Sequence, residues 1–266
     1  AGPNAIAGLL EDTRVEYESS IVWEPSNAAK AMAKLRIHQR FGYSQPRLTP
    51  LLNEPLDLVT PLGPIQHRVR YFLQLVEKLG IDAFVPHSFQ TTPLPARPQP
   101  PRIALCPGSE FGPAFRWPVE RFAETAIKLQ EQHRAELVIL SMPGHTKEAN
   151  ALATRLGDRA RNHAGKFQLG EVLDALVHCS TLLASDGVLP HLAAFSGLPA
   201  VVPIGPGDPN LRRPLGRIHR VLTSHPECGP CLRSKCPLDH RCMQEIPANQ
   251  ACEAVSDILT KSRATA

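Results

Sequence analysis

The chain has 266 residues, a formal net charge of +4, and 42% hydrophobic and 20% charged residues, which is the balance of a soluble globular protein with one large core or two smaller ones. No apolar run approaches the roughly 20 residues that cross a bilayer, and the first residues lack the basic start and apolar core of a signal peptide. We therefore expect a cytoplasmic protein. The modest charge gives no reason to expect nucleic acid as a partner.

The first ninety residues contain four segments with clear secondary-structure patterns. In chain order these are a strand at 19–24, a helix at 25–35, a strand at 39–43 and an amphipathic helix at 65–80 that ends at Gly80. Strands that alternate with helices are typical of α/β domains. Because the four segments make up only about half of such a domain, we expect residues 1–90 to form a partial N-terminal Rossmann-like domain.

A proline-rich stretch follows this first part. Five prolines stand between Thr91 and Pro101, and proline both fixes φ and removes a backbone donor, so a helix is ruled out and extended polyproline geometry is favoured. We interpret residues 91–101 as a semi-rigid linker between two folded parts.

After the linker, short apolar segments alternate with amphipathic ones. Strands are predicted at 102–106, 136–141, 181–185 and 200–205, and helices at 118–132, 146–156, 169–179 and 189–196. This alternation predicts an α/β fold over residues 102–266, a doubly wound Rossmann-like domain with a parallel sheet covered by helices on both faces. Ligands of such sheets bind at the carboxyl ends of the strands.

The loop CPGSEFGPAFRWP, Cys106–Pro118, joins the first of these strands to a helix. Gly108 and Gly112 allow backbone conformations closed to other residues, and Pro118 suits the first helical turn. Free amides at a helix start bind anions, so a phosphate group is the expected ligand. A purely structural strand-to-helix turn is the alternative.

A second group of polar residues follows the strand at 181–185. Asp186 ends the strand, Gly187 lies in the turn, and His191 comes just after Pro190 in the first turn of the next helix. Because carboxyl ends of parallel strands meet at one edge, we expect Asp186 and His191 to reach a ligand held by the loop 106–118. Taken separately, Asp186 also suits a helix cap and His191 a surface position.

The loop at 106–118 and the segments NHAGKFQLGEVLDALVHCSTLLASDGVLPHLAAFSGLPAVVPIGPGDP (162–209) and CGPCLRSKCPLDHRCM (228–243) resemble the ADP-heptose:lipopolysaccharide heptosyltransferases, most closely the heptosyltransferase II type. The likeness is strong over 102–243 and weaker over 22–81. It implies a GT-B architecture of two Rossmann-like domains. It also implies inverting transfer of heptose from ADP-heptose to the inner core of lipopolysaccharide, by an enzyme that is cytoplasmic or peripheral at the inner face of the inner membrane.

The resemblance also implies roles for individual residues. The backbone from Ser109 to Gly112 would cradle the diphosphate, Phe167 would lie against adenine, and Asp186 and His191 would contact the heptose and the diphosphate. No metal is implied at the reaction centre, since helix termini and cationic side chains stabilise the leaving group. The substrate-binding candidates are Ser109, Glu110, Phe111, Gly112, Arg116, Phe167, Asp186, Gly187, Val188, Leu189 and His191.

The sequence departs from the family pattern at three places. Relatives usually carry Lys just before the RWP triplet, where this chain has Phe115, so a cation near the diphosphate is lost and adjacent Arg116 is a conjectural substitute. The usual DSGLMH is DGVLPH here, which puts Val188 where the backbone approaches phosphate. Nothing in Ala1–Tyr17 matches the glycine-turn Asp that the family uses as general base. The catalytic base therefore stays unknown, and a fragment or a degenerate, non-catalytic nucleotide-binding or scaffold protein is the alternative.

Four of the seven cysteines follow the pattern C-x2-C-x4-C-x5-C within residues 228–242, at Cys228, Cys231, Cys236 and Cys242. Disulfides are disfavoured in the cytoplasm, and four thiolates this close predict a structural zinc site, with His240 as a substitute ligand. Reduced structural cysteines are the alternative. The other three, Cys106, Cys179 and Cys252, lie in apolar or helical contexts and are predicted core residues.

A basic stretch overlaps these cysteines. Between Leu211 and Arg241 there are seven Lys or Arg residues and two acids. Such a stretch is either a solvated face or one that attracts nucleotides, phosphosugars or an anionic lipid surface. A zinc-stabilised nucleic-acid module ranks last, because aromatic residues for base stacking are not interleaved with the basic ones.

Overall fold

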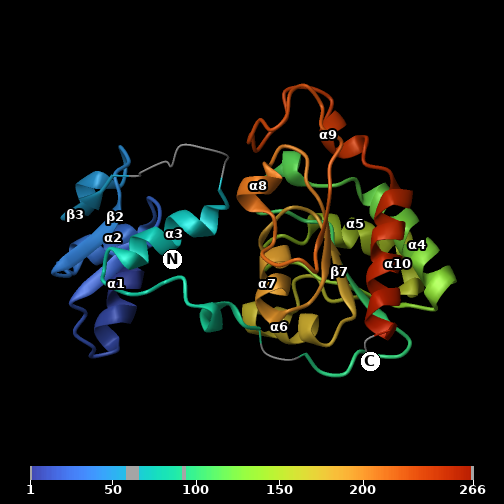
Figure 1. The fold of residues 1–266 in the computed structure, drawn as a ribbon, viewed down its shortest axis with the longest axis horizontal. Coiled ribbons are helices and arrows are strands. Elements are labelled where there is room, and N and C mark those ends of the chain that lie inside the picture. The colour runs from blue at the N-terminus through green and yellow to red at the C-terminus, as the bar shows by residue number, and fades with distance from the viewer. Residues whose placement is uncertain (1, 58–65, 92–93, 265–266) are drawn as a thin grey trace. The chain divides into compact units, whose positions relative to one another are not determined.

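The computed structural model describes residues 2–57, 66–91 and 94–264. The chain divides into two compact units, Ala1–Gln90 and Thr91–Ala266, whose elements are labelled in chain order in Figure 1. The division falls at the first residue of the proline-rich stretch. In the described parts of the chain, no helix combines the length and the apolar character needed to cross a bilayer.

The first unit is built on a small parallel sheet. Its strands lie in the order β1-β2-β3. Along the chain, helices precede, separate and follow these strands. The elements are α1 (Pro3–Asp12), β1 (Ser19–Val22), α2 (Asn27–Lys34), β2 (Gln39–Tyr43), β3 (Glu54–Leu56) and α3 (Arg68–Glu77), with short 3-10 turns at Thr49–Leu51 and Pro86–Phe89. The four predicted elements are present, although residue 65 lies outside the described residues. Ser26 caps α2 by accepting a hydrogen bond from the N–H of Ala29 at 3.1 Å.

The second unit contains a six-stranded parallel sheet in the order β6-β5-β4-β7-β8-β9. Its strands are β4 (Arg102–Cys106), β5 (Glu136–Ile139), β6 (Ala160–Asn162), β7 (Thr181–Ala184), β8 (Ala200–Pro203) and β9 (Arg220–Leu222). The chain runs outward from β4 through β6, returns to β7 beside β4, and runs outward again through β9. The junction between β4 and β7 is therefore the topological switch point, where doubly wound sheets bind ligands.

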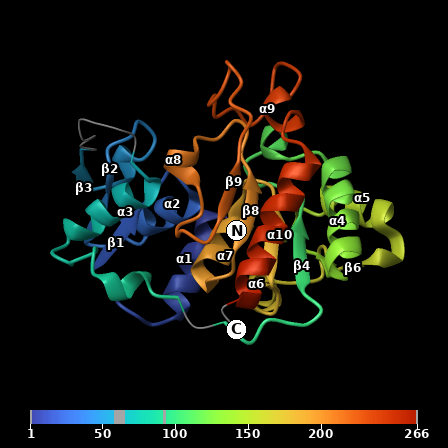
Figure 2. The same ribbon diagram turned by 45° about the vertical axis from the view of Figure 1, so that its right-hand side comes forward.

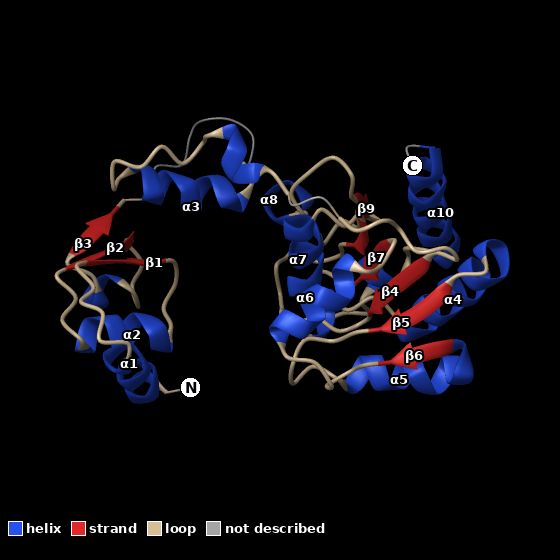
Figure 3. Ribbon diagram, turned by 90° about the horizontal axis from the view of Figure 1, so that it is seen from below, coloured by secondary structure: helices blue, strands red, loops and turns tan. Residues whose placement is uncertain are grey.

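Helices cover both faces of this sheet (Figure 3). They are α4 (Val119–His133), α5 (Lys147–Leu156), α6 (Leu169–Val177), α7 (Val188–Ser196) and α10 (Ala248–Ala264), with short helices α8 (Pro209–Arg212) and α9 (Arg241–Gln244) and 3-10 turns at Pro113–Phe115 and Gly157–Arg159. The long helix α10 packs against α4 (Figure 2). The doubly wound α/β fold expected from the alternating pattern is present.

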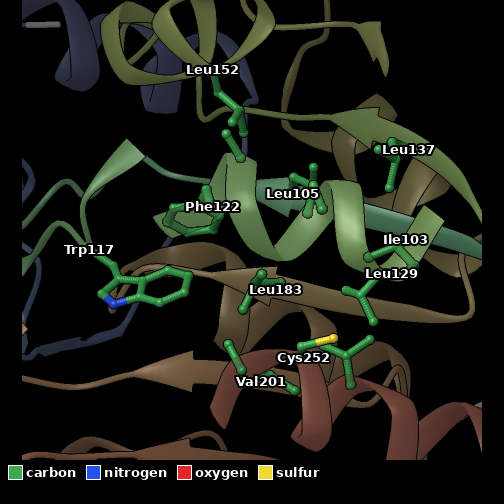
Figure 4. Packing of buried hydrophobic residues seen from close by; sticks show 14 of the residues in the cluster. Ile103, Leu105, Trp117, Phe122, Leu129, Leu137, Leu152, Leu183, Val201 and Cys252 are labelled. Carbon is green, nitrogen blue, oxygen red and sulfur yellow. The ribbon is translucent and has the colours of Figure 1, made fainter. Parts of the chain in front are cut away.

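Two apolar cores lie on opposite faces of the sheet because successive strand side chains point in opposite directions. In β4, Ile103 and Leu105 belong to the core under α4, α5 and α10, whereas Ala104 and Cys106 belong to the core under α6 and α7. Figure 4 shows Trp117 in the first core, beside the aliphatic strand residues. The tip of β4 is thus held from both faces.

The proline-rich segment, interpreted as a semi-rigid linker over 91–101, packs on the second unit. Leu94 packs against the core under α6 and α7, the guanidinium of Arg97 donates to the carbonyl of Ser180, and the carbonyl of Pro101 accepts from the N–H of Glu136 at 2.9 Å. Residues 92–93 of the expected linker lie outside the described residues. These contacts hold the carboxyl end of the segment next to the first residues of β4 and β5.

Candidate functional site

The loops that follow β4 and β7 are joined by direct hydrogen bonds. The buried Ser109 donates through Oγ to the carbonyl of Asp186 at 2.6 Å, and the carboxylate of Glu110 accepts from the N–H of Val188 at 2.9 Å. Ser185 adds a further link, because its Oγ accepts from the N–H of Trp117 at 3.0 Å. The expected convergence of the two strand tips is therefore present at the switch point of the sheet.

The shape of the loop after β4 depends on Gly112. Its φ of 119° and ψ of 173° fall in a region that is essentially restricted to glycine, and a Cβ there would lie 2.6 Å from the carbonyl oxygen of Ser234. The same carbonyl accepts from the N–H of Ala114 at 3.0 Å. Gly108 does not use such freedom, which corrects the expectation for it: its φ is not positive, and a Cβ there would lie 3.4 Å from the carbonyl oxygen of His145.

The start of α7 is occupied by an acid of the neighbouring loop. Gly187 is extended, and a Cβ on it would lie 2.7 Å from Oε2 of Glu110. A side chain on residue 187 would therefore displace the carboxylate of Glu110 from its present position. The carboxylate caps the first amide of α7, at Val188, where its charge also favours the positive end of the helix dipole. An anionic ligand at this helix start therefore has to share it with Glu110.

Asp186 is a buried acid with an unsatisfied oxygen. Its side chain is 2% exposed, and Oδ2 has no hydrogen-bond partner among the described residues. Burial raises the pKa of Asp186 to about 6; Arg212 opposes this rise and Glu110 adds to it. A Cβ on Gly207, in the loop after β8, would lie 2.7 Å from Oδ2. The loop after β8 thus closes over the acid as a third strand tip.

Phe115 is buried and packs with Phe111, their ring centroids 5.6 Å apart. The guanidinium carbon of Arg212, at the end of α8, lies 4.2 Å from the centroid of Phe111 and 5.5 Å from that of Phe115. Arg212 was not among the predicted site residues. Its place in the basic stretch, soon after the strand at 200–205, is the signal that could have indicated it.

Three further candidate residues make contacts within the second unit. Arg116 pairs with Glu148 in the first turn of α5, and Phe167 packs on the core under α6 and α7 with its ring stacked on His163 at 4.9 Å. Leu189 is buried in the same core, so only its backbone can face a ligand. His191 is half-buried on α7.

The sequence from 77 to 241, which contains all of these loops, matches the model of glycosyltransferase family 9 (heptosyltransferase). The chain belongs to this family. Lipopolysaccharide heptosyltransferase 2 of Escherichia coli (strain K12) is 34% identical over 125 residues, which are 46% of this chain and 36% of that protein. Lipooligosaccharide heptosyltransferase 2 of Haemophilus influenzae is 30% identical over 175 residues, 60% of this chain and 48% of that protein. The chain thus spans less than half of these curated relatives.

Solved structures of family 9 enzymes share the fold. The E. coli ADP-heptose LPS heptosyltransferase II matches 98% of this chain and 81% of its own with a TM-score of 0.74 and 23% identity. E. coli heptosyltransferase WaaC with ADP matches 96% of this chain and 78% of its own, with a TM-score of 0.67 and 18% identity. The fold class expected from the sequence, α/β and GT-B-like, is confirmed. The N-terminal unit, expected to be a partial Rossmann-like domain, has a parallel sheet of three strands among the described residues.

The four-cysteine segment of this family 9 chain lies against the candidate site. Its Ser234 carbonyl binds the loop after β4, and the N–H of Leu232 donates to the carbonyl of Pro206 in the loop after β8 at 2.9 Å. Burial is the main cause that raises the pKa of the Cys242 thiol to about 11. The nearby thiols of Cys228, Cys236 and Cys231 add to this rise. Over residues 2–57, 66–91 and 94–264, no three His, Cys, Asp or Glu side chains are arranged to hold a metal, so the zinc site stays a prediction.

The raised pKa of Asp186 gives a specific pH dependence. Burial penalises the ionised form in the folded state, so the contribution of Asp186 to stability is complete below pH of about 4 and is lost as the pH rises through about 6. Replacing Asp186 with asparagine should therefore stabilise the protein relative to wild type by about 2–3 kcal/mol at pH 7 and by little at pH 4. Urea unfolding at several pH values measures this difference. A difference that does not change with pH, as we expect for the exposed Asp174→Asn control, would contradict the assignment.

Proposed function

We propose that this protein is an inverting glycosyltransferase that binds ADP-heptose in its C-terminal unit and transfers the heptose to the inner core of lipopolysaccharide. The observation that supports it is the union of two strand tips at the switch point, where Ser109 is bonded to Asp186 and Glu110 to Val188. Family 9 membership supplies the reaction class, and the curated relatives are named for heptose transfer.

The residues of the site suit a nucleoside diphosphate sugar. Backbone amides between Ser109 and Gly112 and the start of α7 would stabilise the negative charge that develops on the departing ADP. Oδ2 of Asp186 is a buried acceptor without a donor, and buried polar atoms are normally satisfied. A sugar hydroxyl would satisfy it, whereas a phosphate oxygen would repel it, so we assign Asp186 to the sugar.

In the proposed reaction, an acceptor hydroxyl oxygen bonds to the anomeric carbon as the bond from that carbon to the diphosphate oxygen breaks. ADP leaves with the electron pair of that bond, and the hydroxyl proton passes to a base that is not assigned. Inversion follows because attack and departure occur on opposite faces of the sugar. The C-terminal unit contributes donor binding and charge stabilisation to this step.

Nucleotide binding is the direct test of this proposal. A ligand that binds only the folded state at 100 times its Kd stabilises the protein by about 2.7 kcal/mol, so saturating ADP should raise the midpoint of thermal unfolding and adenosine should raise it less. Transfer of heptose from ADP-heptose to an inner-core acceptor should then be measurable. Absence of any thermal protection by ADP would overturn the proposal, and protection without transfer would favour a non-catalytic binding protein.

The lipopolysaccharide acceptor places the proposed reaction at a membrane surface, with the protein cytoplasmic and peripheral at the inner face of the inner membrane. Exposed Leu232 and Leu238 stand beside exposed Arg233 and Lys235 in the four-cysteine segment, a combination that suits an anionic lipid interface. Co-sedimentation should occur with vesicles that contain anionic lipids and weaken as salt is added. Equal binding to purely zwitterionic vesicles would contradict this part of the proposal.

We propose in addition that the four cysteines hold one structural zinc ion. Their spacing along the chain supports this, as does the N–H of Leu238, which donates to Sγ of Cys236 at 3.4 Å. Metal analysis of the purified protein should find about one zinc per chain, and a Cys228→Ser/Cys231→Ser double variant should lose it. Cys179→Ala, which changes a buried thiol in a core, is the control that should keep the metal. Wild-type protein that contains almost no zinc would remove the proposal.

A further inference from the structure

The loop after β8 brings a positive charge to the tips of β4 and β7. Asp208 caps α8 by accepting from the N–H of Asn210 at 2.8 Å, and the N–H of Arg212 donates to the carbonyl of Asp208 at 3.0 Å. The backbone of Arg212 is therefore fixed within one helical turn of Asp208, in the loop that follows β8. This places its side chain at the same edge of the sheet as the loops that follow β4 and β7.

The guanidinium of Arg212 is held over an aromatic pair that belongs to the diphosphate loop itself. Its central carbon lies 4.2 Å from the centroid of Phe111, and Phe111 stands between Ser109 and Gly112, the residues expected to cradle the diphosphate. A cation over an aromatic face at this distance is attracted by the ring, and a planar guanidinium can stack on it while its edge stays available to hydrogen-bond an oxyanion. The aromatic pair thus positions the charge.

The loops that follow β4 and β7 carry negative charges that a cation would balance. The carboxyl groups of Asp186 and Glu110 both lie next to the start of α7. The carboxylate of Glu110 already accepts the hydrogen bond of the first amide of α7, at Val188. A diphosphate would add further negative charge to the same place. Arg212 lies within electrostatic reach of Asp186, since it lowers the pKa of that acid against the effect of burial. The cation therefore acts at the point where the anions gather.

We propose that Arg212 binds the diphosphate of the donor. The inference rests on the proposed function and deepens it, because it names a residue that supplies positive charge to the donor site. Phe115 has a different role, since it is buried beside Phe111 and supports the ring on which the guanidinium stacks. The guanidinium fork matches two phosphate oxygens at once.

The test compares Arg212→Met, Arg212→Lys and Arg213→Met with wild type by calorimetric titration with ADP, inorganic pyrophosphate and adenosine. Met keeps the aliphatic packing over Phe111 and removes the charge, so Arg212→Met should weaken ADP and pyrophosphate binding by about 10- to 100-fold, the range of a charge-assisted hydrogen bond. Adenosine binding should stay unchanged, and Arg212→Lys should recover part of the loss. The neighbouring Arg213→Met is the matched control and should bind ADP within about twofold of wild type.

The outcomes separate this inference from the proposed function. If Arg212→Met binds ADP and pyrophosphate as tightly as wild type does, the role of Arg212 is overturned and the proposed function still stands. Pyrophosphate binding that depends on Arg212, without any ADP binding, would support Arg212 and overturn the adenine nucleotide as ligand. A wild-type protein that binds neither would overturn both. An equal loss of adenosine and ADP in Arg212→Met would show a structural role only and would also refute the inference.

Discussion

Replacing Trp117 with alanine is expected to lower the free energy of unfolding of the C-terminal unit by about 3–5 kcal/mol, the usual cost of truncating a buried large aromatic residue. Trp117 is 1% exposed, its ring centroid lies 5.0 Å from that of Phe122, and its Nε1–H donates to the carbonyl of Ile246 at 3.1 Å. The substitution therefore leaves a cavity between β4, α4 and the segment before α10, and it leaves a buried carbonyl unsatisfied.

Urea unfolding followed by circular dichroism measures this loss. The matched control is Phe195→Ala, an aromatic residue that is 73% exposed on α7, whose replacement should change stability by less than about 0.5 kcal/mol. A loss below about 1 kcal/mol for Trp117→Ala would mean that the core under α4 and α10 is not packed around this ring.

Replacing Gly112 with alanine is expected to weaken ADP binding by at least tenfold, or about 1.4 kcal/mol, and to cost about 1–3 kcal/mol of stability from backbone strain. The new Cβ would lie 2.6 Å from the carbonyl oxygen of Ser234. Because that neighbour is backbone, the loop after β4 has to move away from the four-cysteine segment. This movement would strain the hydrogen bonds by which Ser109 and Glu110 join the loop to Asp186 and Val188.

The control for Gly112→Ala is Gly144→Ala, which separates strain from displacement of the loop. Gly144 also has a positive φ, 79°, but a Cβ there would meet nothing within 4 Å. This variant should lose about 1–2 kcal/mol of stability and retain the ADP affinity of wild type. Isothermal titration of both variants measures the affinities. An unchanged affinity in Gly112→Ala would show that the loop does not contact the ligand.

The sequence predicted the sheet of the second unit where strands are fully buried and continuous. The segments at 102–106 and 181–185 have continuous apolar runs, at 103–106 and 182–184, and lie at the centre of the sheet. Burial on both faces accounts for this clear pattern. The outer strands β6 and β9 have three residues each, with arginine in both, and show no such pattern. Helix α10 was also missed, although it buries apolar residues against α4.

The candidate site was predictable where it depends on the carboxyl ends of adjacent strands and not where it depends on how separate loops pack together. The meeting of Ser109 with Asp186 follows from strand order alone. The contact of Gly112 with Ser234 and the stacking of Arg212 on Phe111 join separate loops. Such contacts arise from tertiary packing, which no local pattern encodes. The loss of a cation at Phe115 was therefore visible in the sequence, and the cation that lies near it was not.

A crystal structure of the protein with ADP would test the donor site most directly. We expect the diphosphate at the carboxyl ends of β4 and β7, against the backbone from Ser109 to Gly112, with the guanidinium of Arg212 on its oxygens. ADP bound at the amino ends of the strands, or on the first unit, would contradict the claim that these strand tips form the donor site.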